Sequence, residues 1–221
     1  MIDIANELNV VHRETGRRRL SAGEGHSVVL RRRYWAAIGD VWDAITNPER
    51  VGRWFLPVTG DLRLGGTYQL EGNAGGEILR CEPPHLLKVT WVVGDHPSGG
   101  GSSEVEVRLA AGADGETLLE LEHVAVVDPA WWAEYGPGAT GVGWDLALLG
   151  LSLHLRGESI GDPETWGASP EAREFMTSSS AAWGAALEAA GATRAEAAAA
   201  VANTTRFYAP DPASAEDQDG S

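Results

Sequence analysis

Cysteine and lysine are scarce in this chain of 221 residues, and each shortage excludes a structural or functional class. Its one cysteine, Cys81, has no partner, so no internal disulfide forms, which is typical of a reducing compartment. Lys88 is the only lysine, and the formal net charge is -15. Nucleic-acid phosphates require clustered basic residues, so we expect no nucleic-acid partner.

Long hydrophobic runs and leader signals are absent as well. No apolar stretch reaches about 18 residues without a charge, so we expect no membrane insertion. Residues 1–8 have neither the basic start nor the apolar centre of a signal peptide. The six His show no paired ligand spacing, so the sequence predicts no metal site and no cofactor. These absences predict a cytoplasmic protein.

Tryptophan and glycine, in contrast, are abundant, with nine Trp and 28 Gly. Apolar residues make up 43% and charged residues 22%, which are ordinary values for a globular chain. The sequence therefore predicts a folded domain with many large aromatic side chains and many tight turns or close backbone approaches.

The N-terminal third alternates between helical and extended patterns. Apolar spacing predicts a short helix over residues 3–13, a polar connection over 17–26 and a strand over 27–34. Apolar residues from Ile38 to Ile45 repeat at helical spacing. Pro48 then suits the first turn of a second short helix, which carries Trp54 and Phe55.

The middle of the chain has the alternation of half-buried strands. From residue 62 to 127 the apolar period is two, which predicts an antiparallel meander with one wet and one dry face. Asp114 and Gly115 form a hairpin signal within it. Residues 128–143 are expected to be irregular, with a possible lid at 131–138. Residues 142–155 are apolar nearly all round, which predicts a buried helix.

The C-terminal part reads as an Ala-rich helical extension. Ser169 and Pro170 predict the start of a helix that runs to about residue 190. Thr193 and Glu196 form the capping box of the next helix, which runs to about residue 207. These helices either pack on the core or form a homodimer through residues 170–207. Residues 209–221 lack periodicity and predict a disordered tail.

Four motifs in register resemble one known family. They are the segment 41–50 with Arg53, Trp54 and Phe55, the segment 61–66, the segment 81–84 leading to Thr90 and Trp91, and the segment 119–123. The chain resembles the START-like SRPBCC superfamily, in the branch named after the activator of Hsp90 ATPase. The likeness covers residues 27–157. It leaves residues 1–26 as an N-terminal helix and connection, 158–208 as a helical extension and 209–221 as the tail.

The resemblance implies an α+β helix-grip fold, in which a curved antiparallel sheet of six to seven strands surrounds a long C-terminal helix. An apolar cavity lies between sheet and helix in this family. Members bind lipids, polyketides, hormones or other apolar molecules, some are aromatase/cyclases, and the namesake domain stimulates a chaperone ATPase. Because fold does not determine function, the resemblance fixes the architecture better than the activity.

Residues on the dry face, the short helix and the long helix are the candidate ligand-binding residues. They are Trp54, Phe55, Tyr68, Val89, Trp91, Val107, Leu121, His123, Trp144, Asp145 and Leu148. Buried Trp and Tyr need partners for N–H and O–H, so this many aromatics around one helix favours a pocket. The alternative is that these side chains simply fill the core.

His123 and Asp145 are the candidate catalytic residues. His123 stands where an apolar residue would continue the pattern of Leu119 and Leu121, and a buried imidazole needs hydrogen bonds. It either bonds to a nearby backbone or aromatic group, or it meets the ligand. Asp145 either stabilises the N-terminal end of the long helix or forms an acid–base pair with His123 at the cavity mouth.

Three functions remain open on the sequence alone. The first is binding of an apolar or amphipathic small molecule, lipid- or polyketide-like, without chemistry. The second is a cyclase- or hydrolase-type enzyme that uses His123 and Asp145. The third is an interaction module, either chaperone-related or self-associating. We favour the first, because the dry face and the family likeness agree on it.

Overall fold

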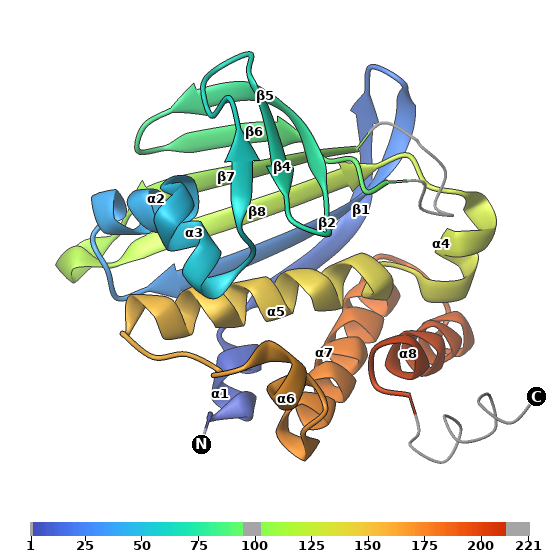
Figure 1. Ribbon diagram of the computed structural model, residues 1–221. Coiled ribbons are helices and arrows are strands. Elements are labelled where there is room, and N and C mark those ends of the chain that lie inside the picture. The colour runs from blue at the N-terminus through green and yellow to red at the C-terminus, as the bar shows by residue number, and fades with distance from the viewer. Residues whose placement is uncertain (1, 95–102, 211–221) are drawn as a thin grey trace, which may run out of the picture.

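The computed structural model describes residues 2–94 and 103–210. A curved, open antiparallel sheet covers one side of a long helix, α5 (Gly138–Leu155), and further helices cover the other side (Figure 1). The sheet has eight strands in the order β1-β2-β8-β7-β6-β5-β4-β3. The α+β helix-grip prediction is confirmed, although six to seven strands were expected.

The strands follow the chain almost as a meander, with β1 and β2 added beside β8. Their bounds are β1 (His12–Leu20), β2 (Gly23–Tyr34), β3 (Val58–Gly60), β4 (Thr67–Leu70), β5 (Gly75–Glu82), β6 (Leu86–Thr90), β7 (Ser103–Ala111) and β8 (Thr117–Ala125). Val107 is paired with Leu121 and Val105 with His123. Because side chains alternate along a strand, this register puts all four on the face that looks toward α5.

Within the described residues, seven further α-helices frame the sheet and α5. They are α1 (Ile4–Asn9), α2 (Ile38–Thr46), α3 (Pro48–Trp54), α4 (Pro129–Tyr135), α6 (Pro163–Gly167), α7 (Pro170–Ala189) and α8 (Arg194–Tyr208). The expected start of α3 is confirmed, since the Asn47 side chain accepts a hydrogen bond from the Glu49 N–H. The Trp54 indole N–H donates to the Ala44 carbonyl, which fixes α3 against α2.

The predicted N-terminal helix and connection are wrong in part. The helix ends at Asn9, and residues 12–20 form strand β1 instead of loop. β1 is the edge strand of the sheet, and an edge strand with an exposed face tolerates charged side chains. Arg17 pairs with Glu24 and Arg18 with Glu122 across this part of the sheet. The run of arginines therefore gives this strand the polar composition that is typical of a connection.

Most of residues 128–143 lie in two helices, α4 and the start of α5, contrary to the expected irregular segment. In α4 the Asp128 side chain accepts from the Ala130 N–H, and α5 begins at Gly138, one turn before the predicted start. A Cβ at Gly141 would lie 2.1 Å from Trp183 of α7, and one at Gly138 would lie 2.4 Å from Thr204 of α8. These glycines permit helices to cross closely, so the glycine-rich start of α5 is not a loop.

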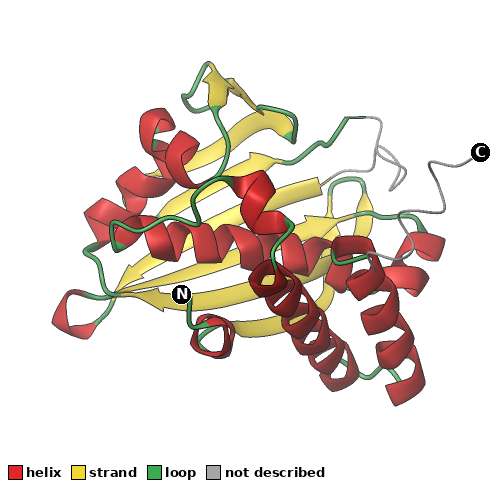
Figure 2. Ribbon diagram, turned by 60° about the horizontal axis from the view of Figure 1, so that its bottom comes forward, coloured by secondary structure: helices red, strands yellow, loops and turns green. Residues whose placement is uncertain are grey.

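The Ala-rich helices pack on their own chain. Ser169 caps α7, and the capping box of Thr193 and Glu196 opens α8, as predicted. Figure 2 shows α7 and α8 as a hairpin beside α5. Phe175 and Trp183 of α7 are almost fully buried. The homodimer through residues 170–207 stays a prediction, and so does the division into four segments. Residues 211–221 of the predicted tail lie outside the described residues.

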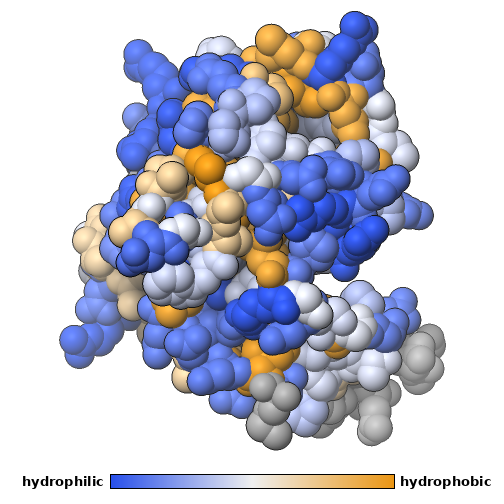
Figure 3. Space-filling view, turned by 90° about the vertical axis from the view of Figure 1, so that its left-hand side faces the viewer, coloured by the Kyte–Doolittle hydropathy of each residue, from blue (hydrophilic) through white to orange (hydrophobic). Residues whose placement is uncertain are grey.

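The surface on the side of α2 and α3 is largely hydrophilic, with separate hydrophobic patches (Figure 3). Leu62 and Leu64, in the connection between β3 and β4, are among the exposed large apolar side chains. None of the described helices is both long enough and apolar enough to cross a membrane.

Candidate functional site

A cavity of about 200 Å³ lies between the inner face of the sheet, α3 and α5. Nine of the eleven predicted site residues line it: Trp54, Phe55, Tyr68, Val89, Trp91, Val107, Leu121, Trp144 and Leu148. Leu70, Leu87, Val105, Leu119 and Leu151 join them. We call this space the inner cavity. Strand alternation and helical spacing together therefore predicted most of its wall.

Some lining residues escaped the sequence analysis because the sheet is irregular. Ile78 and Cys81 of β5 both line the inner cavity although they stand three positions apart. A register shift between Ile78 and Arg80 makes this possible, because a β-bulge returns the following residue to the same face. Strict alternation cannot predict a bulge. Ile45, Thr46 and Val51 also line the cavity, from the α2–α3 pair.

The polar groups in this wall are already bonded to the protein. The Tyr68 hydroxyl donates to the Thr90 carbonyl at 2.7 Å, and burial raises the pKa of this phenol. The Thr46 hydroxyl donates to the Trp42 carbonyl at 2.7 Å, and the Trp54 indole donates to Ala44. The wall therefore presents mainly apolar surface, with its hydrogen-bonding groups turned to the backbone.

A second cavity of about 330 Å³ adjoins the first near the N-terminal end of α5. We call it the outer cavity. Phe55, Trp91 and Trp144 line both spaces, and the rings of Trp91 and Trp144 lie 4.9 Å apart between centroids. The outer cavity also has polar lining, from Ser103, His123 and Thr140. Trp131 of the predicted lid lines it too, from α4 rather than from a loop.

His123 is buried in the wall of the outer cavity, with 8% of its surface exposed. The Trp144 indole N–H donates to His123 Nδ1 at 3.0 Å, and His123 Nε2 lies 2.6 Å from Ser103 Oγ. Burial lowers the pKa of the imidazole to about 4, so the ring is neutral near pH 7. The predicted need for hydrogen bonds is met by a Trp and a Ser side chain.

Asp145 lies elsewhere, so its predicted place at the cavity mouth is wrong. It lines neither cavity and is 2% exposed on the far side of α5, by which we mean the side that faces away from the cavities, toward β1 and α7. Arg13 Nη2 donates to it at 2.9 Å, and Ser179 and Trp183 of α7 donate to it as well. Successive helical residues point about 100° apart, so Trp144 and Asp145 face different sides of α5.

The acid–base pair of His123 and Asp145 is therefore not assembled. The two side chains share no hydrogen-bond partner, since His123 bonds to Ser103 and Trp144. Burial raises the pKa of the Asp145 carboxyl, and the adjacent Arg13 charge opposes that shift. Asp145 acts in the packing of α5 against β1 and α7.

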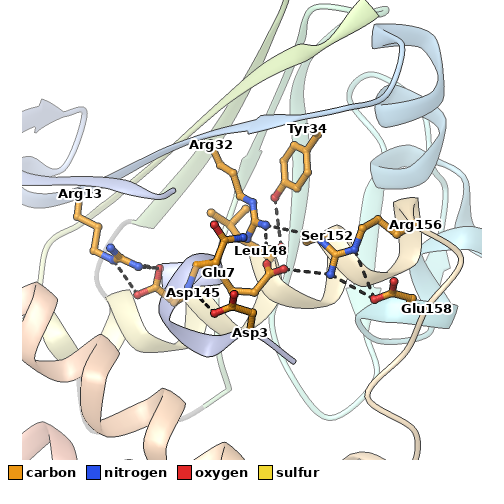
Figure 4. A network of polar contacts seen from close by, with 11 residues as sticks. Asp3, Glu7, Arg13, Arg32, Tyr34, Asp145, Leu148, Ser152, Arg156 and Glu158 are labelled. Carbon is orange, nitrogen blue, oxygen red and sulfur yellow. Dashed lines mark hydrogen bonds and ion pairs between the residues drawn. The ribbon is translucent and has the colours of Figure 1, made fainter. Parts of the chain in front are cut away.

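A second buried ion pair also lies on the far side of α5. Arg32 of β2 donates to Glu7 of α1 at 2.5 Å and to Ser152 of α5 at 2.6 Å. Arg156 reaches the other oxygen of Glu7 at 3.0 Å. Figure 4 shows these side chains meeting beside α5, with Arg13 and Asp145 nearby. Together they fasten the N-terminal helix and strands to the long helix.

No group of three or more His, Cys, Asp or Glu side chains is placed to hold a metal ion within residues 2–94 and 103–210. The curved sheet, the helix along it and the apolar space between them define a helix-grip protein. The chain belongs to the family described as Activator of Hsp90 ATPase homolog 1-like protein, which it matches over residues 36–155. The predicted resemblance is thereby confirmed.

Solved structures agree with this assignment. The crystal structure of CalU16 from Micromonospora echinospora is 41% identical, with a TM-score of 0.65, over 80% of this chain and 98% of that one. Its solution NMR structure gives 41% and 0.66, over 82% and 97%. DynU16, a protein of the dynemicin biosynthetic locus, shares the fold at 22% identity and a TM-score of 0.52, over 60% and 48%. Comparison with curated protein sequences gives no match.

Proposed function

We propose that this protein binds an apolar or amphipathic small molecule, lipid- or polyketide-like, between its sheet and α5. The observation that carries the proposal is the inner cavity, whose wall is mainly apolar, with Thr46 and Arg63 as its polar and charged members. Its aromatic rings and aliphatic chains come from strands β4 to β8, from α3 and from α5. Ligand pockets are commonly lined in this way, with few polar groups.

The hydrogen-bonding groups of the wall already have partners within the protein, and this favours an apolar ligand. Tyr68, Trp54 and Thr46 each donate to a backbone carbonyl, so they do not need a ligand or a water as partner. An apolar molecule that enters removes its own surface from water, and each Å² of it contributes about 25 cal/mol. A charged molecule, in contrast, would lose its hydration, and the one charged side chain described in this wall, Arg63, is already paired with Asp61.

Binding without chemistry is the reading that the geometry favours over a cyclase or hydrolase. The proposed catalytic pair of His123 and Asp145 is divided between the two sides of α5. His123 has a low pKa and two partners from its own chain. A general base needs to reach the proton that it removes, and the described lining of the outer cavity contains no Asp, Glu, Lys or Arg that could act with His123.

A cavity-filling variant tests the proposal. Val107 of β7 lines the inner cavity, so Val107→Phe should fill part of it and weaken binding of the neutral fluorescent probe N-phenyl-1-naphthylamine at least tenfold, the ratio that corresponds to about 1.4 kcal/mol. Ala110→Phe adds the same ring at an exposed position of the same strand and should leave the affinity unchanged. If the wild-type protein does not bind the probe, or if Val107→Phe binds it equally well, the proposal fails.

A thiol measurement gives a second readout of the same cavity. Cys81 is the only cysteine of the chain and lines the inner cavity. A bound molecule should therefore slow the reaction of the protein with a maleimide. Equal rates with and without saturating probe would place the probe outside this cavity.

A further inference from the structure

The hydrogen bonds of the outer cavity fix the position of one proton. The indole N–H of Trp144 can only donate, and it donates to His123 Nδ1 at 3.0 Å. Nδ1 is therefore the acceptor, and the proton of the neutral imidazole sits on Nε2. That N–H then donates to Ser103 Oγ, 2.6 Å away.

Ser103 is consequently an acceptor toward His123, and its own hydroxyl proton is directed elsewhere. No acceptor among the described residues takes that proton, and Ser103 lines the outer cavity. This polarity is the reverse of a catalytic Ser–His pair, in which the imidazole accepts the serine proton. The buried imidazole thus holds the serine oxygen in place and leaves its O–H as a donor.

The lack of charged side chains around the outer cavity determines which kind of acceptor the Ser103 hydroxyl can bind. The described lining of the outer cavity contains no Arg, Lys, Asp or Glu, and burial keeps His123 neutral. An anionic group would be desolvated there without a counter-charge, which is strongly unfavourable. A neutral oxygen acceptor, such as a ketone, an ester or a quinone, fits this cavity.

We propose that Ser103 is the polar anchor of the ligand: its hydroxyl donates a hydrogen bond to a neutral carbonyl oxygen, while the apolar part of the ligand lies against Phe55, Trp91 and Trp144. The inference rests on the proposed function and refines its ligand class to amphipathic, carbonyl-bearing molecules. His123 is a positioning residue in this arrangement, since it acts through Ser103.

A pair of probes that differ in one carbonyl tests the anchor. Prodan carries a propionyl ketone on a dimethylaminonaphthalene, and its emission moves to longer wavelength when the ketone accepts a hydrogen bond. 2-(Dimethylamino)naphthalene lacks the ketone. In the full-length protein, Ser103→Ala should weaken Prodan binding about three- to tenfold, as expected for one neutral hydrogen bond, and shift the bound emission to shorter wavelength. Binding of the ketone-free probe should not change.

A control hydroxyl outside both cavities separates the anchor from the loss of any hydroxyl group. Thr15 of β1 lines neither cavity, and its hydroxyl donates to the Ser27 carbonyl at 2.9 Å. Thr15→Val should therefore leave the affinities of both probes within twofold of wild type. An equal loss of Prodan binding in Thr15→Val and Ser103→Ala would contradict a specific role of Ser103.

The outcomes distinguish this inference from the proposed function. If wild type binds both probes and Ser103→Ala binds Prodan with unchanged affinity and emission, the anchor is wrong while the apolar site stands. If wild type binds neither, the binding function itself fails. The ¹⁵N spectrum of the imidazole gives an independent check, since a protonated Nδ1 and unprotonated Nε2 at His123 would also overturn the anchor.

Discussion

The two sides of α5 are built in opposite ways. Toward the sheet, Trp144, Leu148 and Leu151 border an open cavity. On the side that faces away from the cavities, Asp145 is enclosed by Arg13 of β1 and by α7, and Gly141 lies against the Trp183 ring without room for a methyl group. Interiors are normally packed to high density, so a cavity persists only where the surrounding elements are held in place. The far side of α5 provides that restraint.

The restraint comes largely from segments outside the family match. Residues 36–155 match the family, whereas Arg13, Glu7 and Trp183 belong to β1, α1 and α7. Buried ion pairs contribute little net stability compared with apolar packing, but losing one partner is costly. They therefore fix which surfaces meet. We infer that the two termini hold α5 at its distance from the sheet.

The largest expected effect follows from breaking the Arg13–Asp145 pair. Asp145→Ala leaves the guanidinium of Arg13 buried without a counter-charge, and should lower the free energy of unfolding by about 3–5 kcal/mol in urea titrations. The exposed pair of Arg17 and Glu24 in the same hairpin is the control, and Glu24→Ala should have no measurable effect. Equal midpoints for Asp145→Ala and wild type would show that the far side of α5 is not a restraint.

The same comparison explains what the sequence could predict. Alternation along strands placed five of the nine predicted wall residues around the inner cavity, because one apolar face of a sheet must be covered, and the spacing within the helices placed the other four. The same alternation extends to Ser103, which has the same parity as Val105 and Val107. The residues on the cavity side of α5 and of the sheet are thus largely predictable from the sequence.

The far side was less predictable, for a physical reason. A charged residue in an apolar helix, such as Asp145, indicates burial with a partner. That partner, Arg13, stands 132 positions away on strand β1, where the local apolar spacing predicts the end of a helix. Gly138 and Gly141 of α5 are typical of a loop in the sequence. Their close contacts with Thr204 and Trp183 explain why a helix has glycine at these positions. Such features depend on contacts between distant segments, and local patterns do not record them.

Acid should weaken the cavity side through His123. Its pKa falls from 6.5 in the unfolded chain to about 4 when buried, so between these values the unfolded state binds more protons. The free energy of unfolding should therefore decrease as the pH falls from about 6.5 to 4, by about 3 kcal/mol in total at 1.36 kcal/mol per pH unit. Denaturant titrations at several pH values measure this slope.

A glutamine at the same position isolates this contribution. His123→Gln keeps an acceptor for Trp144 but does not titrate, so its stability should depend less steeply on pH over the same range. His26 and His154, whose pKa values burial also lowers, contribute equally to both proteins and cancel in the difference. Parallel profiles for the two proteins would mean that His123 is not kept neutral by burial.

The smallest of these effects probes how closely α7 approaches α5. A Cβ at Gly141 would lie 2.1 Å from Trp183 Cε2, so Gly141→Ala should force the two helices apart and cost about 1–3 kcal/mol by thermal or urea unfolding. Gly39→Ala, in α2 with nothing within 4 Å of the new methyl group, should instead stabilise by roughly 0.5–1 kcal/mol. If both substitutions stabilise, α7 does not rest on α5 at this glycine, and the contrast between the open and the packed side of the helix is weaker than the contacts indicate.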